Sequence, residues 1–254
     1  APKMGVVVVH GWTSCRMGPH QMLVKICRQL NREGMASLRF DLRGRGESEG
    51  DPLKSHLDGM ISDTCAAGDF LRRESGAERL GIVGICSGGN VAIGAATLRD
   101  DVDSLALWST LPFQPQRKVK DDLRRTGFFL TDYAKKAFRA ETWKKLFGGK
   151  IHFKLIGRVL FGHYAAEKDA EGRNPKDSAR DIMAEFGGYK GTALFMYGGN
   201  DPEAKGAHEV YSGFCAEKGI RSDFRFIPGA NHNFYSLEWE RQVIEQSVEW
   251  LKRG

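Results

Sequence analysis

The sequence has no hydrophobic run long enough to cross a membrane. The apolar stretch near its start, MGVVVVHGW, is far shorter than the roughly 20 residues that a membrane-spanning helix needs. No basic segment precedes it, so we expect no secretory signal peptide. Apolar residues make up 41% of the 254-residue chain and charged residues 28%, which is typical of a soluble globular protein. That length suits one α/β domain with an insertion.

The chain has few cysteines, and no two of them are closely spaced in the sequence. The five cysteines are widely spaced and form no C-x-x-C motif, which argues against a disulfide framework and against a zinc site. Histidine pairs at metal-binding spacing, such as H-x-x-x-H, are also missing, so we expect no metal and no other cofactor. The chain contains no nucleic-acid-binding motif. These absences favour a protein of the reducing cytoplasm that acts on a small molecule.

Short apolar segments alternate with amphipathic ones along most of the chain. We predict strands at 5–11, 35–44, 79–86, 104–110, 191–202 and 222–229, and helices at 20–34, 60–74, 88–99, 203–219 and 237–253. Strands that alternate with helices indicate βαβ units. The predicted fold class is therefore α/β, with a mostly parallel central sheet and helices on both faces.

One long segment, residues 111–190, interrupts this alternation. It contains no convincing strand, and it carries 18 lysines and arginines against 10 acidic residues. A segment of this length between two strands predicts a helical cap inserted into a core formed by 1–110 and 191–254. Its excess positive charge has two interpretations: it attracts an anionic substrate, or it is a solvated face whose long side chains cover apolar helix surface.

Two neighbouring residues in the segment GIVGICSGGN could act as a nucleophile. A sharp strand-to-helix turn presents a nucleophile above a parallel sheet, and it needs very small residues two positions before and after its centre. Centred on Cys86, these positions are Gly84 and Gly88; centred on Ser87, the preceding position is the bulky Ile85. The spacing therefore favours Cys86.

The residue that follows the nucleophile then contributes its backbone. Ser87 opens the next helix, so its N–H points toward the reacting carbonyl, and its hydroxyl is expected to be incidental. The dipole of that helix favours a thiolate at Cys86 and lowers the pKa of the thiol. The alternative is a buried structural cysteine, which the glycines on both sides make a poor explanation.

This turn, the order of the elements and the segment VVVVHGW together resemble the α/β-hydrolase family. The resemblance covers nearly the whole chain and implies a catalytic triad in the order nucleophile, acid, histidine. It assigns these roles to Cys86, Asp201 in MYGGNDP and His232 in PGANHNF. It also implies an oxyanion hole formed by the backbone N–H groups of Trp12 and Ser87.

Two further motifs fit the same family. The resemblance places His10 in the loop of the oxyanion hole, where it organises the backbone. FDLRGRGES matches the family's turn after the second strand, and there Asp41 has two interpretations: an alternative triad acid, or part of a turn linked by a salt bridge to Arg43. We favour the structural role for Asp41.

The sequence departs from the most common family pattern in its nucleophile, which is usually serine. The turn G-x-C-x-G-G uses cysteine, as in dienelactone hydrolases, whereas the large insert is more similar to that of capped hydrolases. The segments GWTSCRMGPH, LRFDLRGRGESEG and ETWKKLFGGKIHFKLI resemble hydrolases associated with exosortase or exopolysaccharide systems. The expected activity is cleavage of a carboxylic ester or thioester through an acyl-cysteine. An acyltransferase that uses the same triad and a non-catalytic binding protein are the alternatives, and the oligomeric state stays open.

Overall fold

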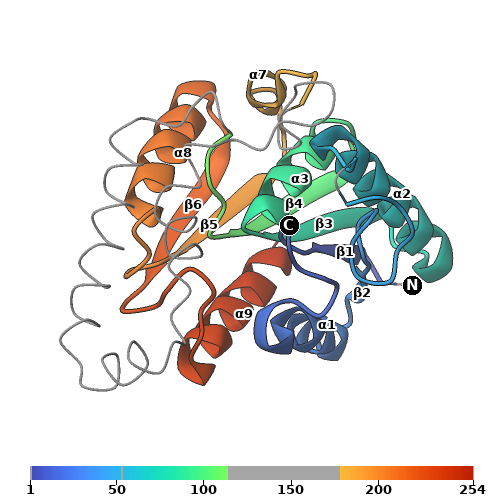
Figure 1. Ribbon diagram of the computed structural model, residues 1–254, viewed down its shortest axis with the longest axis horizontal. Coiled ribbons are helices and arrows are strands. Elements are labelled where there is room, and N and C mark those ends of the chain that lie inside the picture. The colour runs from blue at the N-terminus through green and yellow to red at the C-terminus, as the bar shows by residue number, and fades with distance from the viewer. Residues whose placement is uncertain (1, 53, 114–177, 254) are drawn as a thin grey trace, which may run out of the picture. The chain divides into compact units, whose positions relative to one another are not determined.

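A computed structural model describes residues 2–52, 54–113 and 178–253, and its centre is a six-stranded sheet (Figure 1). The strand order is β2-β1-β3-β4-β5-β6, and every neighbouring pair is parallel. The bounds are β1 Met4–Val9, β2 Ala36–Arg39, β3 Arg79–Ile85, β4 Val102–Trp108, β5 Thr192–Gly198 and β6 Arg221–Ile227. The α/β fold with a parallel sheet predicted from the sequence is confirmed.

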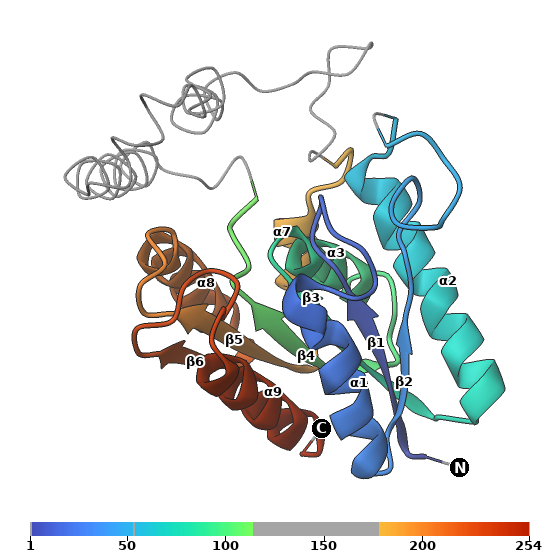
Figure 2. The same cartoon turned by 60° about the horizontal axis from the view of Figure 1, so that its bottom comes forward.

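Helices cover both faces of the sheet. Helices α1 and α9 lie side by side on one face, and α2, α3, α7 and α8 lie on the other (Figures 1 and 2). Their bounds are α1 Met22–Arg32, after the 3-10 turn η1 Pro19–Gln21, then α2 Leu57–Ser75, α3 Ser87–Ala96, α7 Ile182–Phe186, α8 Ala204–Lys218 and α9 Leu237–Leu251. Of the helices in the described ranges, none combines the length and apolarity needed to span a bilayer.

The side chains of β1 explain why its sequence is apolar throughout. Val6 and Val8 are buried in the layer that contains α1 and α9, whereas Val7 and Val9 are buried in the layer with α2 and α3. A central parallel strand is covered on both faces, so alternate residues enter two separate cores. The same alternation fixes the register of the strand against its neighbours.

The all-parallel sheet brings several loops together. Because every strand runs in the same direction, the loops that follow β1, β3, β5 and β6 leave from the same edge of the sheet. Ligand and active sites of open α/β sheets lie outside this carboxyl edge. The fold therefore gathers residues from distant parts of the chain at one place.

The predicted cap, residues 111–190, falls mostly outside the described residues and stays a prediction. The described end of that segment contains α7, which the alternation of strands and helices did not predict. Ile182, Met183 and Phe186 of α7 are buried in the same core layer as α3. At least this short part of the segment packs with the sheet domain.

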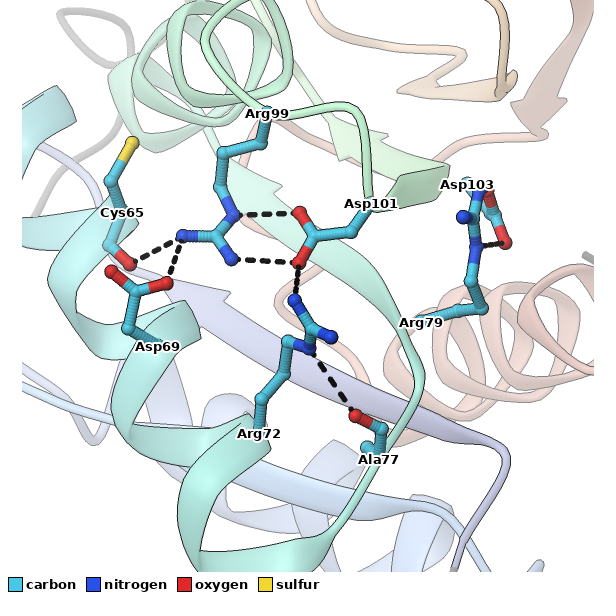
Figure 3. A network of polar contacts seen from close by, with 8 residues as sticks. All are labelled: Cys65, Asp69, Arg72, Ala77, Arg79, Arg99, Asp101 and Asp103. Atoms are coloured by element: carbon cyan, nitrogen blue, oxygen red, sulfur yellow. Dashed lines mark hydrogen bonds and ion pairs between the residues drawn. The ribbon is translucent and has the colours of Figure 1, made fainter.

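A network of ion pairs joins α2 to the segment between α3 and β4 (Figure 3). Arg99 donates to both carboxylate oxygens of Asp101, at 2.8 and 2.7 Å, to Asp69 at 2.6 Å and to the carbonyl oxygen of Cys65 at 3.0 Å. Arg72 also donates to Asp101, at 2.7 Å. The network lies where β4 begins, at the opposite end of that strand from the loops described above.

Candidate active site

Cys86 occupies a strained turn between β3 and α3. Its backbone angles, φ 54° and ψ −124°, lie outside the regions that a residue with a side chain normally adopts. A Cβ atom on Gly84 would lie 2.5 Å from the carbonyl oxygen of Gly88, and one on Gly88 would lie 2.5 Å from that of His10. The turn thus has its strained centre at the residue that the glycine spacing selects, whereas Ser87 is the first residue of the helix.

The three residues expected to form a triad come together at the carboxyl edge of the sheet. Nδ1 of His232 lies 2.8 Å from Oδ2 of Asp201, whose side chain is only 1% exposed. The imidazole of His232 also acts on the thiol of the half-buried Cys86, because each group shifts the pKa of the other. Because Asp201 engages Nδ1, the Nε2 atom is the one left to face the thiol.

The environment moves the pKa values of cysteine and histidine in opposite directions. Burial alone would raise the pKa of Cys86, but hydrogen bonding to His232, its positive charge and the N–H of Ser87 together lower it. Burial would lower the pKa of His232, but its bonds to Asp201 and Cys86 raise it to about 10. The pair is therefore arranged to hold a thiolate beside an imidazolium, which is the nucleophilic form of cysteine.

Hydrogen bonds between loops fix the position of His232. The hydroxyl of Ser109, just after β4, donates to the carbonyl oxygen of His232 at 2.8 Å. The N–H of Asn200 donates to the carbonyl oxygen of Ala230 at 2.8 Å. This bond joins the loop after β5, which carries Asp201, to the loop after β6, which carries His232. Ser109 has a positive φ of 46°. No sequence motif marks Ser109, because its role depends on a backbone contact with a distant loop.

The loop after β1 reaches the turn at Cys86 through Trp12. Its backbone N–H donates to the hydroxyl oxygen of Ser87 at 2.6 Å. The resemblance places Trp12 and Ser87 in the oxyanion hole, and the structure brings them together. The hydroxyl of Ser87, however, is not incidental as the sequence suggests, because it accepts the hydrogen bond of this backbone donor.

Two side chains hold this loop in place. His10 is completely buried; its Nε2 accepts from the N–H of Leu42 at 3.1 Å, so its Nδ1 carries the proton that bonds to the carbonyl oxygen of Gly11 at 2.8 Å. Burial lowers the pKa of His10, which keeps it neutral. Arg45 donates to the carbonyl oxygen of Trp12 at 2.6 Å and lies over the indole, 5.1 Å from the ring centre.

Asp41 has a structural environment. Its carboxylate accepts from the backbone N–H groups of Arg16 at 2.6 Å and Glu47 at 3.1 Å, and it pairs with the guanidinium of Arg16. The expected salt bridge to Arg43 is wrong, because Arg43 pairs with Asp63 at 2.6 Å on α2. Asp41 thus joins its own turn to the loop after β1, while Asp201 is the acid beside His232.

One group of possible metal ligands coincides with the site. Asp201, Glu203 and His232 each offer one ligand atom, and these three atoms lie within 4.8 Å of one another. Asp201 and His232 already bond to each other through Oδ2 and Nδ1, atoms that a metal would also use. The negative charge of Glu203 acts on the thiol by raising its pKa, against the effect of His232. The expectation of no metal stays a prediction.

Comparison with known proteins identifies the family. The model of the alpha/beta hydrolase family matches residues 6–246, and the chain belongs to this family. No curated protein matches the chain by sequence.

Several solved structures share the fold. Similar ones include a dienelactone hydrolase from Anabaena variabilis (15% identity, TM-score 0.62, covering 100% of this chain and 87% of that one) and an esterase from Pyrococcus furiosus (17%, 0.65, 100% and 82%). A protein from Butyrivibrio proteoclasticus, solved with ferulic acid bound, is also similar (18%, 0.61, 99% and 90%). At these identities the similarity establishes the fold, and the site must be argued from its own residues.

Proposed function

We propose that this protein hydrolyses a carboxylic ester or thioester of a small molecule through an acyl-cysteine intermediate. The observation that carries the proposal is the meeting of three groups: Nδ1 of His232 lies 2.8 Å from the buried carboxylate of Asp201, and the imidazole and the thiol of Cys86 shift each other's pKa. A nucleophile within reach of a base, with the base oriented by a buried acid, is the arrangement that nucleophilic catalysis requires. The family and its esterase and dienelactone hydrolase relatives in fold are consistent with this chemistry.

In the first half of the reaction the Sγ atom of Cys86 attacks the carbonyl carbon. A C–S bond forms, and an electron pair moves onto the carbonyl oxygen, which donors of the oxyanion hole stabilise. Collapse of this intermediate breaks the bond to the alcohol or thiol, which leaves with the proton from Nε2 of His232. Asp201 keeps the imidazole oriented throughout by its bond to Nδ1.

In the second half water replaces the leaving group. His232 accepts a proton from the water as the water attacks the thioester carbonyl, and the second tetrahedral intermediate expels the sulfur of Cys86. The released product is a carboxylic acid. A thiolate is a good leaving group, so this expulsion is favourable. It leaves Cys86 as a thiolate beside the protonated His232, as before the reaction.

The test is intact-mass spectrometry after brief exposure to p-nitrophenyl esters and acyl thioesters of increasing chain length. We expect a mass increase of one acyl group on Cys86 that decays as product forms. Cys86→Ala should show neither the adduct nor the hydrolysis. Cys15→Ala, which removes another half-buried cysteine, is the matched control and should behave like the unaltered protein. Turnover without an adduct at Cys86, or an adduct on another residue, would contradict the proposal.

A further inference from the structure

The hydroxyl of Ser87 occupies a specific position between the nucleophile and the loop after β1. Its Oγ lies 2.6 Å from the backbone nitrogen of Trp12. A Cβ atom added to Gly11 would lie 3.6 Å from Cβ of Cys86 and 3.8 Å from Oγ of Ser87. The hydroxyl and the side chain of the nucleophile therefore face the same short piece of backbone.

The hydrogen-bonding capacity of this hydroxyl is only partly used. A serine hydroxyl offers one proton and two lone pairs. The N–H of Trp12 takes one lone pair, and within the described parts of the chain no group accepts the proton. Ser87 is half-buried and lies next to Cys86, so a carbonyl oxygen that reaches the thiol also comes close to this O–H group.

We propose that the Ser87 hydroxyl is a catalytic hydrogen-bond donor of the oxyanion hole. The inference rests on the proposed function. While the sulfur of Cys86 bonds to the substrate carbon, the O–H of Ser87 donates to the developing oxyanion, and the N–H of Trp12 continues to donate to Oγ. The Ser87 proton stays on its oxygen throughout this step. The N–H of Trp12 polarises the hydroxyl, which makes it a stronger donor, because hydrogen bonds in a chain reinforce one another.

The inference differs from a direct role for Trp12. If the oxyanion bonded directly to the N–H of Trp12, the Ser87 hydroxyl would compete for that donor in the resting protein and would have to leave it. Removing the hydroxyl would then free the donor and speed acylation. If the hydroxyl is itself the donor, removing it slows acylation, although the freed N–H of Trp12 recovers part of the loss.

The experiment measures the rate of acylation of Cys86 by stopped-flow release of p-nitrophenol in the first turnover. In Ser87→Ala we expect the rate to fall about tenfold or more, while the apparent substrate affinity changes little. Ser87→Thr, which keeps a hydroxyl, should retain most of the rate. Ser87→Val has the shape of threonine without its hydroxyl, and it should be as slow as Ser87→Ala.

A second readout separates catalysis from folding. Replacing the carbonyl oxygen of the substrate by sulfur removes a good hydrogen-bond acceptor, so the difference between Ser87→Thr and Ser87→Val should shrink with a thiono ester. Ser14→Ala, a hydroxyl deletion in the loop after β1, serves as the control. An unchanged or faster acylation in Ser87→Ala, or equal rates in Ser87→Thr and Ser87→Val, would overturn the inference.

The experiment distinguishes failure of this inference from failure of the proposed function. If the unaltered protein forms no adduct at Cys86 with any ester or thioester, the proposed function fails. If it forms the adduct and the Ser87 variants form it just as quickly, only the role of the hydroxyl fails.

Discussion

At the scale of single residues, the pKa of Cys86 depends on two groups behind it. His232 lowers the pKa of the thiol, and Asp201 supports the positive charge on His232. The resemblance to the α/β-hydrolase family assigns these roles to both residues by their places after the last two strands. Their effect on the thiol depends on burial and hydrogen bonding, which only the assembled site provides.

Replacing Asp201 by asparagine should make Cys86 a more ordinary thiol. Loss of the carboxylate lowers the pKa of His232, and the weaker positive charge then raises the pKa of Cys86. Iodoacetamide labelling of Cys86, followed by peptide mass spectrometry across pH, should show its midpoint shift upward. Asp223→Asn, at the pair with Arg225 on β6, is the control and should leave the midpoint in place. Coincident profiles for Asp201→Asn and the unaltered protein would contradict this account.

Replacing Asp41 by asparagine should destabilise the fold by about 2–4 kcal/mol at neutral pH, because it removes a buried charge from Arg16 and from two N–H donors. Although burial opposes the shift, these donors hold the pKa of Asp41 below its ordinary value. The stabilisation is therefore complete above the ordinary pKa and disappears as the pH falls through the lower, folded-state value.

Urea unfolding at a series of pH values measures this effect. The difference between Asp41→Asn and the unaltered protein should be large at pH 7 and should shrink in strong acid. Glu47→Gln removes the exposed partner of Arg16, with a side chain 79% exposed, and should change stability by less than about 1 kcal/mol. A pH-independent penalty for Asp41→Asn would show that its charge has no part in stability.

At the scale of elements, the junction of β3, α3 and the loop after β1 leaves no space for added atoms. Gly88→Ala would place a Cβ atom 2.5 Å from the carbonyl oxygen of His10 and 2.6 Å from that of Val9. Backbone atoms cannot rotate away, so α3 must shift. We expect a loss of about 3 kcal/mol or more, together with slower acylation of Cys86.

A second glycine provides the matched control. Gly213 lies in the exposed face of α8, and a Cβ atom there would meet nothing within 4 Å. Gly213→Ala should stabilise the protein by about 0.5–1 kcal/mol, because alanine is the better helix former. Thermal and urea unfolding of the two variants should therefore move in opposite directions. If Gly88→Ala leaves the free energy of unfolding unchanged, the turn can relax in ways that its packing does not suggest.

The helices and strands of the structure agree closely with those predicted from the sequence, and the places where the two differ have physical causes. The strand predicted at 35–44 ends at Arg39, because Asp41 leaves the sheet to bind Arg16. The short helix α7 was not expected, since five residues are too few for a clear apolar period. The contacts of Ser87, Ser109 and Arg45 join loops that are far apart in sequence, and such contacts leave no local pattern.

At the scale of the whole molecule, an ion-pair network and the candidate site lie at opposite ends of the strands. The network around Arg99 lies where β4 begins (Figure 3), whereas the candidate site lies at the carboxyl edge. The side chain of Arg99 is only 11% exposed, and that of Asp101 is 16% exposed. Arg99→Met would leave the carboxylate of Asp101 with one cation, Arg72, to offset the cost of removing its charge from water. We expect a loss of about 3 kcal/mol and an unchanged acylation rate at low temperature.

Urea unfolding and stopped-flow acylation of the same preparation test both parts of this prediction. Arg241→Met is the control: its side chain is 57% exposed and pairs with Glu238 and Glu245 along the surface of α9, so we expect no measurable change in stability. Slower acylation in folded Arg99→Met would show that the two ends of the sheet are coupled.

The position of β6 at the edge of the sheet also affects when the proposed site can form during synthesis. The chain is made from its N-terminus, so Cys86 leaves the ribosome long before His232. Until β6 pairs with β5 and its loop reaches the turn, the nascent chain carries an ordinary thiol with no base beside it. The order of the elements along the chain thus keeps Cys86 and His232 apart until nearly the whole sheet has been made.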